Sequence, residues 1–174
     1  GDTLADRAAR VVLAARGAFR TERFDPADGS DERQWCSPGF DLPVASVMRT
    51  MYGRYPEYHT SLDDRRILSF EALAESVEVY ESIVHAIERN AIWMNTSPEG
   101  EPQLSRHDLY GGIGSRKRTP SEDKALFWVL NLADGDHDVL DIIERSGLPP
   151  AAVAAAIERL AAAGLLIRRE PERP

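Results

Sequence analysis

The sequence predicts an α/β chain in which two periodic regions are joined by an irregular one. In the first region, apolar residues recur at helical spacing over residues 4–15 and 73–87. Two short runs, residues 18–24 and 42–48, are typical of strands, the second of an edge strand or a strand end. Residues 122–170 show the pattern helix, helix, helix, strand. We therefore expect an α/β portion followed by an α-rich domain.

Composition places the boundaries between these regions. We predict a first domain over residues 1–94, a linker over 95–121 and a second domain over 122–174. The linker is rich in glycine and proline, and its basic triplet at 116–118 is interpreted as a solubilising element.

The clearest single element is a helix that begins at Ser69, a plausible N-cap, and ends near Asn90. Its apolar positions follow a spacing of four and three residues, which predicts that they face inward: Leu73, Val77, Tyr80, Val84 and Ile87. Its acidic positions are interpreted as a solvated face rather than as catalytic groups: Glu75, Glu78, Glu81 and Glu88.

The C-terminal region resembles a winged helix-turn-helix domain. A tight turn at residues 146–150 introduces a third helix, Gly164 ends it, and residues 165–169 suggest a first wing strand. The helix after the turn offers only Glu158 and Arg159 beyond apolar residues. Residues 122–174 hold six Lys or Arg against ten Asp or Glu, a net charge of −4. This argues against direct DNA binding and favours packing against another domain or a second subunit.

Overall composition excludes several classes of protein. With 174 residues and 43% hydrophobic content the chain can form a proper core. Its net charge of −8 argues against a nucleic-acid or anionic-membrane surface. The longest apolar runs, residues 151–156 and 160–167, are too short to cross a bilayer. A single cysteine, Cys36, forms no internal disulfide, so we expect a cytoplasmic protein.

Residues 55–64 are the densest in chemistry, with an imidazole, phenols, hydroxyls and carboxylates. His59 suits metal binding, and Asp63 or Asp64 would suit the orientation of its ring. The competing interpretation is a solvated turn whose hydroxyls and carboxylates cap the next helix.

A second cluster lies at residues 29–39. Its Ser30, Asp31 and Glu32 suit an amine, a water or a metal, or else form a turn with an internal ion pair. A nucleophile and base pair of Cys36 and His59 is disfavoured, because the sequence offers no third orienting group.

Three segments, residues 30–44, 48–50 and 55–64, together resemble the bacterial aminopeptidase-like branch of the zinc peptidases related to leucyl aminopeptidase. The resemblance spans residues 1–174, since that branch also ends in a winged helix module. It implies the C-terminal portion of a zinc-peptidase mixed-sheet fold followed by an α-rich winged helix domain.

The resemblance also implies roles for individual residues. His59 takes the place of the final metal ligand, for one or two zinc ions, and Asp63 or Asp64 would orient it or cap the next helix. Ser30, Asp31 and Glu32 would lie near the substrate, and the two carboxylates would meet its amine or a second metal. Tyr58 and Arg49 are candidates for carbonyl or carboxylate contacts.

The other ligands and the general base are then expected before Gly1, so that this chain alone should not catalyse. The expected partners are the missing N-terminal half of the catalytic domain, a small peptide-like substrate and a possible second copy of the chain, with no nucleic acid and no membrane. The chain's opening within a predicted helix also suggests a piece of a longer polypeptide. The alternatives are a non-catalytic interaction protein that assembles through its winged helix and, less favoured, a transcriptional regulator.

Overall fold

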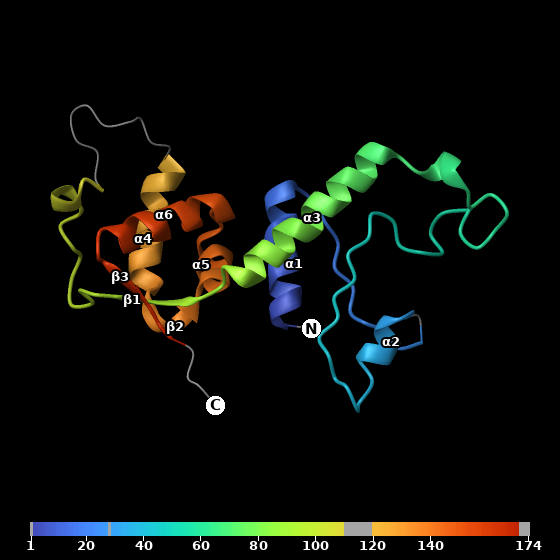
Figure 1. Cartoon of the computed structure of the whole chain (residues 1–174), viewed down its shortest axis with the longest axis horizontal. Coiled ribbons are helices and arrows are strands. Elements are labelled where there is room, and N and C mark those ends of the chain that lie inside the picture. The colour runs from blue at the N-terminus through green and yellow to red at the C-terminus, as the bar shows by residue number, and fades with distance from the viewer. Residues whose placement is uncertain (1, 28, 110–119, 171–174) are drawn as a thin grey trace. The chain divides into compact units, whose positions relative to one another are not determined.

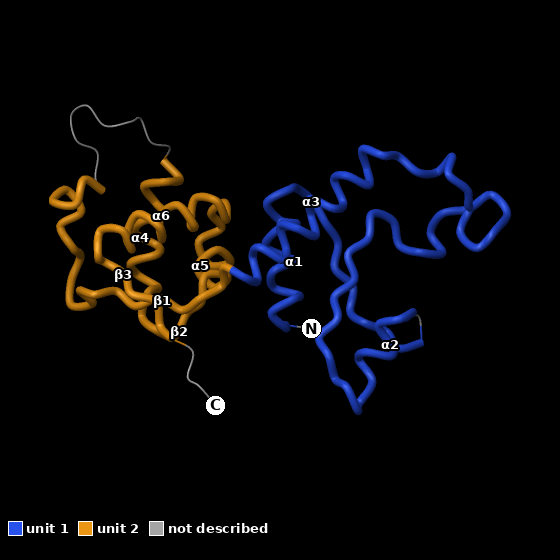
Figure 2. Tube along the Cα trace, viewed as in Figure 1, with its two compact units in different colours: residues 1–88 blue, residues 89–174 orange. Residues whose placement is uncertain are grey.

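The computed structural model describes residues 2–27, 29–109 and 120–170, and the chain divides into two compact units, residues 1–88 and 89–174 (Figure 2). The division lies before the expected domain boundary at residue 94. Residues 95–109 of the expected linker belong to the second unit, and the basic triplet at 116–118 lies outside the described residues.

Unit 1 is built on two helices that pack side by side, α1 (Leu4–Arg16) and α3 (Phe70–Glu88) (Figure 1). A capping box starts α1, because the Asp6 backbone N–H donates to Thr3 Oγ1 and the Thr3 backbone N–H donates to the Asp6 carboxylate at 3.1 Å. The helix buries Ala8, Ala9, Val11 and Val12. Between the two helices the described residues form a short helix, α2 (Glu32–Trp35), and a 3₁₀ turn, η1 (Arg65–Ile67), as their regular elements.

The two strands expected in this unit do not form, so that part of the prediction was wrong. Residues 18–24 and 42–48 belong to no strand and are largely exposed. The backbone–backbone hydrogen bonds of the second run are local, from Leu42 N to Trp35 O at 2.9 Å and from Val44 N to Leu42 O at 3.0 Å. An extended segment becomes a strand only when another strand completes its ladder, and neither run finds one among the described residues.

The prediction for α3 was right about the element and wrong about its inward face. Ser69 caps the helix, with Ala72 N donating to Ser69 Oγ at 3.2 Å. The most buried residue of the helix is Ile83. It lies on the same face as four half-buried residues that the sequence analysis did not single out: Ala72, Ser76, Val79 and Ala86. Of the five expected inward residues, Ile87 is half-buried. The other four are exposed: Leu73, Val77, Tyr80 and Val84.

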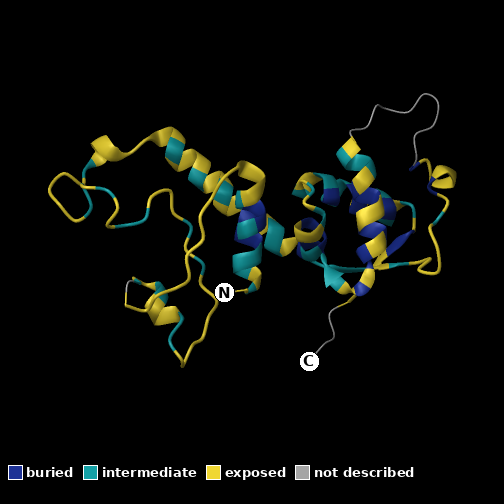
Figure 3. Cartoon of the chain, turned by 180° about the vertical axis from the view of Figure 1, so that it is seen from behind, coloured by how far each residue is buried: buried dark blue, intermediate teal, exposed yellow. Residues whose placement is uncertain are grey.

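Unit 2 places three helices on a small antiparallel sheet. The helices are α4 (Pro120–Leu132), α5 (Val139–Ser146) and α6 (Pro150–Ala162), and the strands are β1 (Ile92–Asn95), β2 (Asp134–Asp138) and β3 (Leu166–Arg168), in the order β2-β1-β3. A 3₁₀ turn, η2 (Leu104–His107), precedes α4. The core lies mainly among the three helices (Figure 3), and its largest fully buried side chains are Leu126, Leu140, Ile142, Leu160, Val129 and Val153.

The α-rich winged helix domain is therefore confirmed, together with the overall α/β class. Gly147, with φ at 62°, ends α5 and opens the turn, and Pro150 starts α6. The expected wing strand forms as β3, but it pairs with β1, which precedes all three helices. Among the described residues no strand follows β3, so no wing hairpin is formed there.

None of the helices in the described part of the chain combines the length and the apolar character that crossing a bilayer requires.

Candidate metal and substrate loops

The His59 segment is a run of tight turns, not a regular element. Tyr58 N donates to Tyr55 O at 3.3 Å, Thr60 N to Glu57 O at 3.1 Å, and Asp63 N to Thr60 O at 3.1 Å. The Thr60 hydroxyl reinforces the middle turn by donating to Glu57 O at 2.8 Å. These hydrogen bonds are all local, so the Thr60 hydroxyl and the backbone carbonyls of this segment stabilise the conformation of the loop.

His59 itself is exposed and sits in the left-handed region of backbone conformation, with φ at 57°. This conformation is uncommon for residues other than glycine, although histidine, asparagine and aspartate adopt it more often than most. The imidazole stacks on Tyr58, with ring centroids 4.0 Å apart and planes 13° from parallel. Stacking on Tyr58 restrains the plane of the imidazole, and the ring remains exposed to solvent.

Two further rings extend this stack. Tyr52 lies 6.0 Å from Tyr58 in a stacked arrangement, and Tyr55 meets Tyr58 edge to face at 5.5 Å. We call these three tyrosines and His59 the tyrosine–histidine cluster. Partial burial raises the pKa of the Tyr55 phenol, and the charge of Asp63 acts in the same direction. Sequence reasoning missed Tyr52 and Tyr55 as partners, although a tyrosine at every third position from residue 52 to 58 was a visible signal.

The two aspartates that follow have different surroundings. Asp64 caps η1, accepting from Arg66 N at 2.8 Å and from Arg66 Nε at 3.0 and 2.9 Å. The hydrogen bonds from the Arg66 side chain, followed by that from its backbone, lower the pKa of Asp64. Asp63 is exposed. Within the described residues no hydrogen bond joins either carboxylate to His59, so capping is the role that the structure gives to Asp64.

The Ser30 cluster forms the first turn of α2. The Ser30 carbonyl accepts from Arg33 N at 3.2 Å, and the Asp31 carbonyl accepts from Gln34 N at 2.9 Å. Ser30 and Asp31 are exposed, and Glu32 is half-buried. Cys36 is also half-buried, and its thiol donates to Leu42 O at 3.4 Å. These side chains present two carboxylates on an accessible loop.

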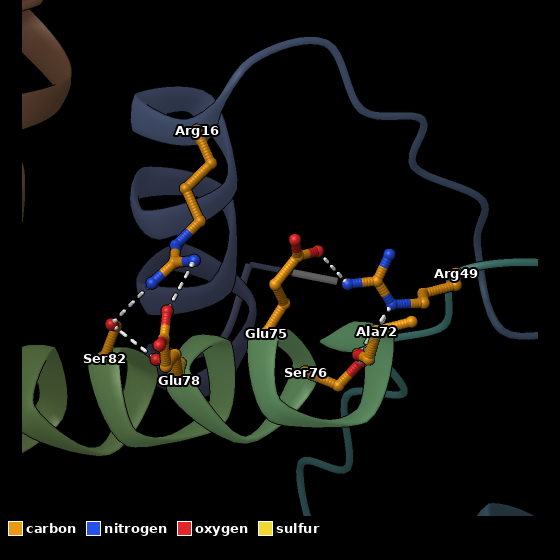
Figure 4. A network of polar contacts seen from close by, with 7 residues as sticks. All are labelled: Arg16, Arg49, Ala72, Glu75, Ser76, Glu78 and Ser82. Atoms are coloured by element: carbon orange, nitrogen blue, oxygen red, sulfur yellow. Dashed lines mark hydrogen bonds and ion pairs between the residues drawn. The ribbon is translucent and has the colours of Figure 1, made fainter. Parts of the chain in front are cut away.

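Arg49 is the candidate whose surroundings differ most from the expectation. Its Nε donates to Ala72 O and to Ser76 Oγ, both at 3.0 Å, and its Nη2 contacts Glu75 (Figure 4). The adjacent segment is also anchored, because the Tyr80 hydroxyl donates to Val47 O at 2.9 Å. The guanidinium therefore clamps residues 47–49 onto α3, and a contact with substrate would require it to leave these partners.

A second arginine ties α1 to the same helix. Arg16 donates to Ser82 Oγ at 3.4 Å and lies 3.8 Å from the Glu78 carboxylate (Figure 4). Two of the carboxylates interpreted as a solvated face, Glu75 and Glu78, thus form ion pairs at the surface of the helix.

Among residues 2–27, 29–109 and 120–170, no group of three or more His, Cys, Asp or Glu side chains is placed to hold a metal ion. An exposed, stacked imidazole fits the role of one ligand. It does not make a metal site by itself, because a zinc site needs about three protein ligands.

Comparison with protein families assigns both parts of the chain. Residues 1–90 match the family described as a domain of unknown function, DUF4910, and the chain belongs to this family. Residues 91–168 match the winged helix-turn-helix family.

A named protein and a solved structure, both from Clostridium acetobutylicum, are similar to the chain. One is 40% identical over 149 residues, 85% of this chain and 34% of its own length, and carries a name that provisionally assigns it to polysaccharide biosynthesis with an aminopeptidase-like domain. The other is the crystal structure of a provisionally assigned peptidase, with a TM-score of 0.85 and 35% identity over 97% of this chain and 37% of that chain. The predicted kinship with aminopeptidase-like proteins that end in a winged helix is confirmed at this level. The chain spans about a third of the length of the relatives that it matches.

Proposed function

We propose that this chain supplies one part of the active site of a metal-dependent, aminopeptidase-like hydrolase. The reaction would cleave an amide bond beside a free amine in a small peptide-like substrate. The observation that carries the proposal is the likeness of nearly the whole chain to a peptidase structure at 35% identity, together with an exposed imidazole held in one plane by stacked tyrosines.

His59 is the proposed zinc ligand of this chain, for a centre of one or two ions. Zinc, when bound, lowers the pKa of a coordinated water and polarises a carbonyl. The chain's own contribution is to hold the imidazole. Tyr58 packs against one face of the ring, and the tight turns of residues 55–63 fix the backbone beneath it.

The substrate side of the proposal rests on charge. A free amine is cationic near neutral pH. The carboxylates of Asp31, which is exposed, and Glu32, which is half-buried, suit an ammonium group. Tyr58 offers a phenol beside His59 for a substrate carbonyl. Asp63 remains a candidate for orienting the imidazole, whereas Arg49 would serve the site by keeping residues 47–49 against α3.

The remaining ligands and the general base are assigned to a partner, namely the part of the longer relatives that this chain does not match. The proposed test uses a chimera in which the chain replaces the matched third of the Clostridium acetobutylicum relative. We expect the chimera to bind zinc and to hydrolyse amino-acid amides. His59→Ala should lower zinc content and turnover together.

The matched control for that experiment is His107→Ala, which removes another exposed histidine far along the chain. It should change neither zinc content nor turnover. A chimera that binds no zinc, or a His59→Ala variant that keeps both properties, would overturn the enzyme proposal.

A second function concerns the winged helix unit, which we propose to be an assembly module. The exposed positions of α6 include Ala151, Glu158 and Ala162, and Arg159 donates to Leu109 O at 3.2 Å. A DNA-reading helix needs polar and basic side chains on its exposed face. Mobility-shift assays at physiological salt should therefore detect no DNA binding, and tight binding would favour the regulator instead.

A further inference from the structure

Helix α3 carries an apolar face that stays about half exposed in the described structure. We define the open stripe as Leu73, Val77, Tyr80 and Val84. We propose that the open stripe is a docking surface for an apolar face, bordered by Lys or Arg, in the part of the longer relatives that this chain does not match. This inference concerns assembly, and it holds whether or not the assembled protein is an enzyme.

Exposure is the first observation. The residues of the stripe are 47%, 56%, 49% and 52% exposed in chain order. They are spaced by four, three and four residues, which places them on one face of the helix. Single exposed apolar residues are ordinary on protein surfaces, but a continuous row of four large ones marks an interaction site.

A second apolar stripe on the same helix is already used. Val79, Ile83 and Ala86 lie on the face that packs against α1, with Ile83 buried. Helix α3 is thus apolar on two adjoining faces, and only the remaining face is rich in carboxylates. A helix with two apolar faces is typically packed on both of them. In the described chain α1 packs against one, and the open stripe is the other.

The details of the stripe suit an apolar contact. Val77, Tyr80, Glu81, Val84 and His85 line a shallow hollow of about 420 Å³, large enough to receive side chains from a partner. The Tyr80 hydroxyl already donates to Val47 O at 2.9 Å. Its polar end is therefore satisfied within the chain, and the ring can be covered without stranding a donor.

Charge decides which occupant fits. Glu81 borders the hollow, and the neighbouring face of α3 adds further carboxylates. In a symmetric contact the same patch lies on both sides, so a second copy of this acidic chain would set carboxylates against carboxylates. A basic border on the partner avoids this repulsion. The relatives carry about two-thirds of their length beyond the match, which is ample to supply such a face.

The test compares lysine substitutions in two settings, the 174-residue chain and the chimera with the Clostridium acetobutylicum relative. Val77→Lys and Val84→Lys each place a lysine four residues before a glutamate, Glu81 or Glu88, so they should leave the isolated chain as stable as before. In the chimera each should lower Tm by about 5 °C or more, because a charge enters an apolar contact.

Ala74→Lys is the matched control. It lies on the carboxylate-rich face, four residues before Glu78, and should be silent in both settings. A labelling experiment adds an independent readout. A cysteine at position 77 should react at least about tenfold more slowly with a maleimide in the chimera than in the isolated chain, whereas a cysteine at position 74 should react equally in both.

Three results would overturn the inference. The first is a chimera in which the Val77 and Val84 variants are as stable as the Ala74 control and position 77 is labelled freely. The second is destabilisation of the isolated chain by Val77→Lys, which would mean that the occupant lies within the 174 residues. The third is a dimer of the isolated chain, measured by light scattering, that these substitutions dissociate.

Discussion

The two units of this chain differ in how completely they bury their apolar residues. Among the described residues, unit 1 buries five apolar side chains, and four of these belong to α1. Unit 2, of similar length, buries eighteen. Unit 2 has a closed core, whereas unit 1 has two packed helices and long exposed loops. Because apolar burial is the main favourable term in folding, the difference predicts that unit 1 by itself is less stable than unit 2.

The largest expected effect breaks the core of unit 2. Leu160→Ala removes a side chain that is fully buried. It should lower the free energy of unfolding by about 3 kcal/mol, within the usual range for buried leucines. Urea unfolding followed by fluorescence measures this in a Trp35→Phe background, in which Trp93 and Trp128 of unit 2 remain as reporters.

The same substitution type in unit 1 supplies the comparison. Val77→Ala truncates an exposed side chain and should cost the isolated chain less than about 0.5 kcal/mol. Equal losses from Leu160→Ala and Val77→Ala would show that the two units are packed alike, and the contrast drawn above would be wrong.

An intermediate effect concerns acid. Burial raises the pKa of Asp134, but hydrogen bonds from Asp136 N, His137 N and the His137 ring outweigh it, and the net shift is downward from the ordinary value of 3.8. A lowered folded-state pKa stabilises the fold above the unfolded-state pKa, and this stabilisation is lost as pH falls through the folded-state value. Unit 2 should therefore lose stability below about pH 4. Asp134→Asn should flatten that dependence, as measured by Tm against pH, and an unchanged slope would count against the assignment.

A further small effect separates global stability from local opening in unit 1. Arg49→Ala removes contacts with Ala72, Ser76 and Glu75 that lie at the surface, so the free energy of unfolding should change by less than about 1 kcal/mol. Limited proteolysis within residues 47–68 should nevertheless become faster, because the clamp on α3 is lost. Arg20→Ala, whose guanidinium lies 3.0 Å from Glu22, is the matched control for a surface ion pair outside residues 47–68.

Sequence reasoning worked where a local signal decides the structure. Ser69, Gly147 and Pro150 marked helix ends because caps and turns act within a few residues. It failed for β2, whose residues Asp134–Asp138 contain no apolar alternation and become a strand only by pairing with β1. It also assigned the wrong inward face to α3, since both faces are apolar and only the position of α1 distinguishes them.

The candidate site divides in the same way. The density of chemical groups around His59 was visible in the sequence, and the stacking of Tyr58 on its ring follows from their adjacency. The hydrogen bonds between Arg49 and α3 join residue 49 to residues 72–76, and no local sequence pattern predicts a contact over that separation. The zinc assignment stays a prediction, because the groups that would complete a metal centre are absent among the described residues.

The strand order of unit 2 has a consequence for how the chain is made. The central strand, β1, is complete at Asn95, but its partners span Asp134–Asp138 and Leu166–Arg168. During synthesis β1 stays unpaired on both edges until β2 has left the ribosome, and its other edge stays unpaired until β3 follows. A nascent chain stalled before Leu166 would leave the β3-facing edge of Met94 and Asn95 unpaired, and a chaperone that shields free strand edges would bind there.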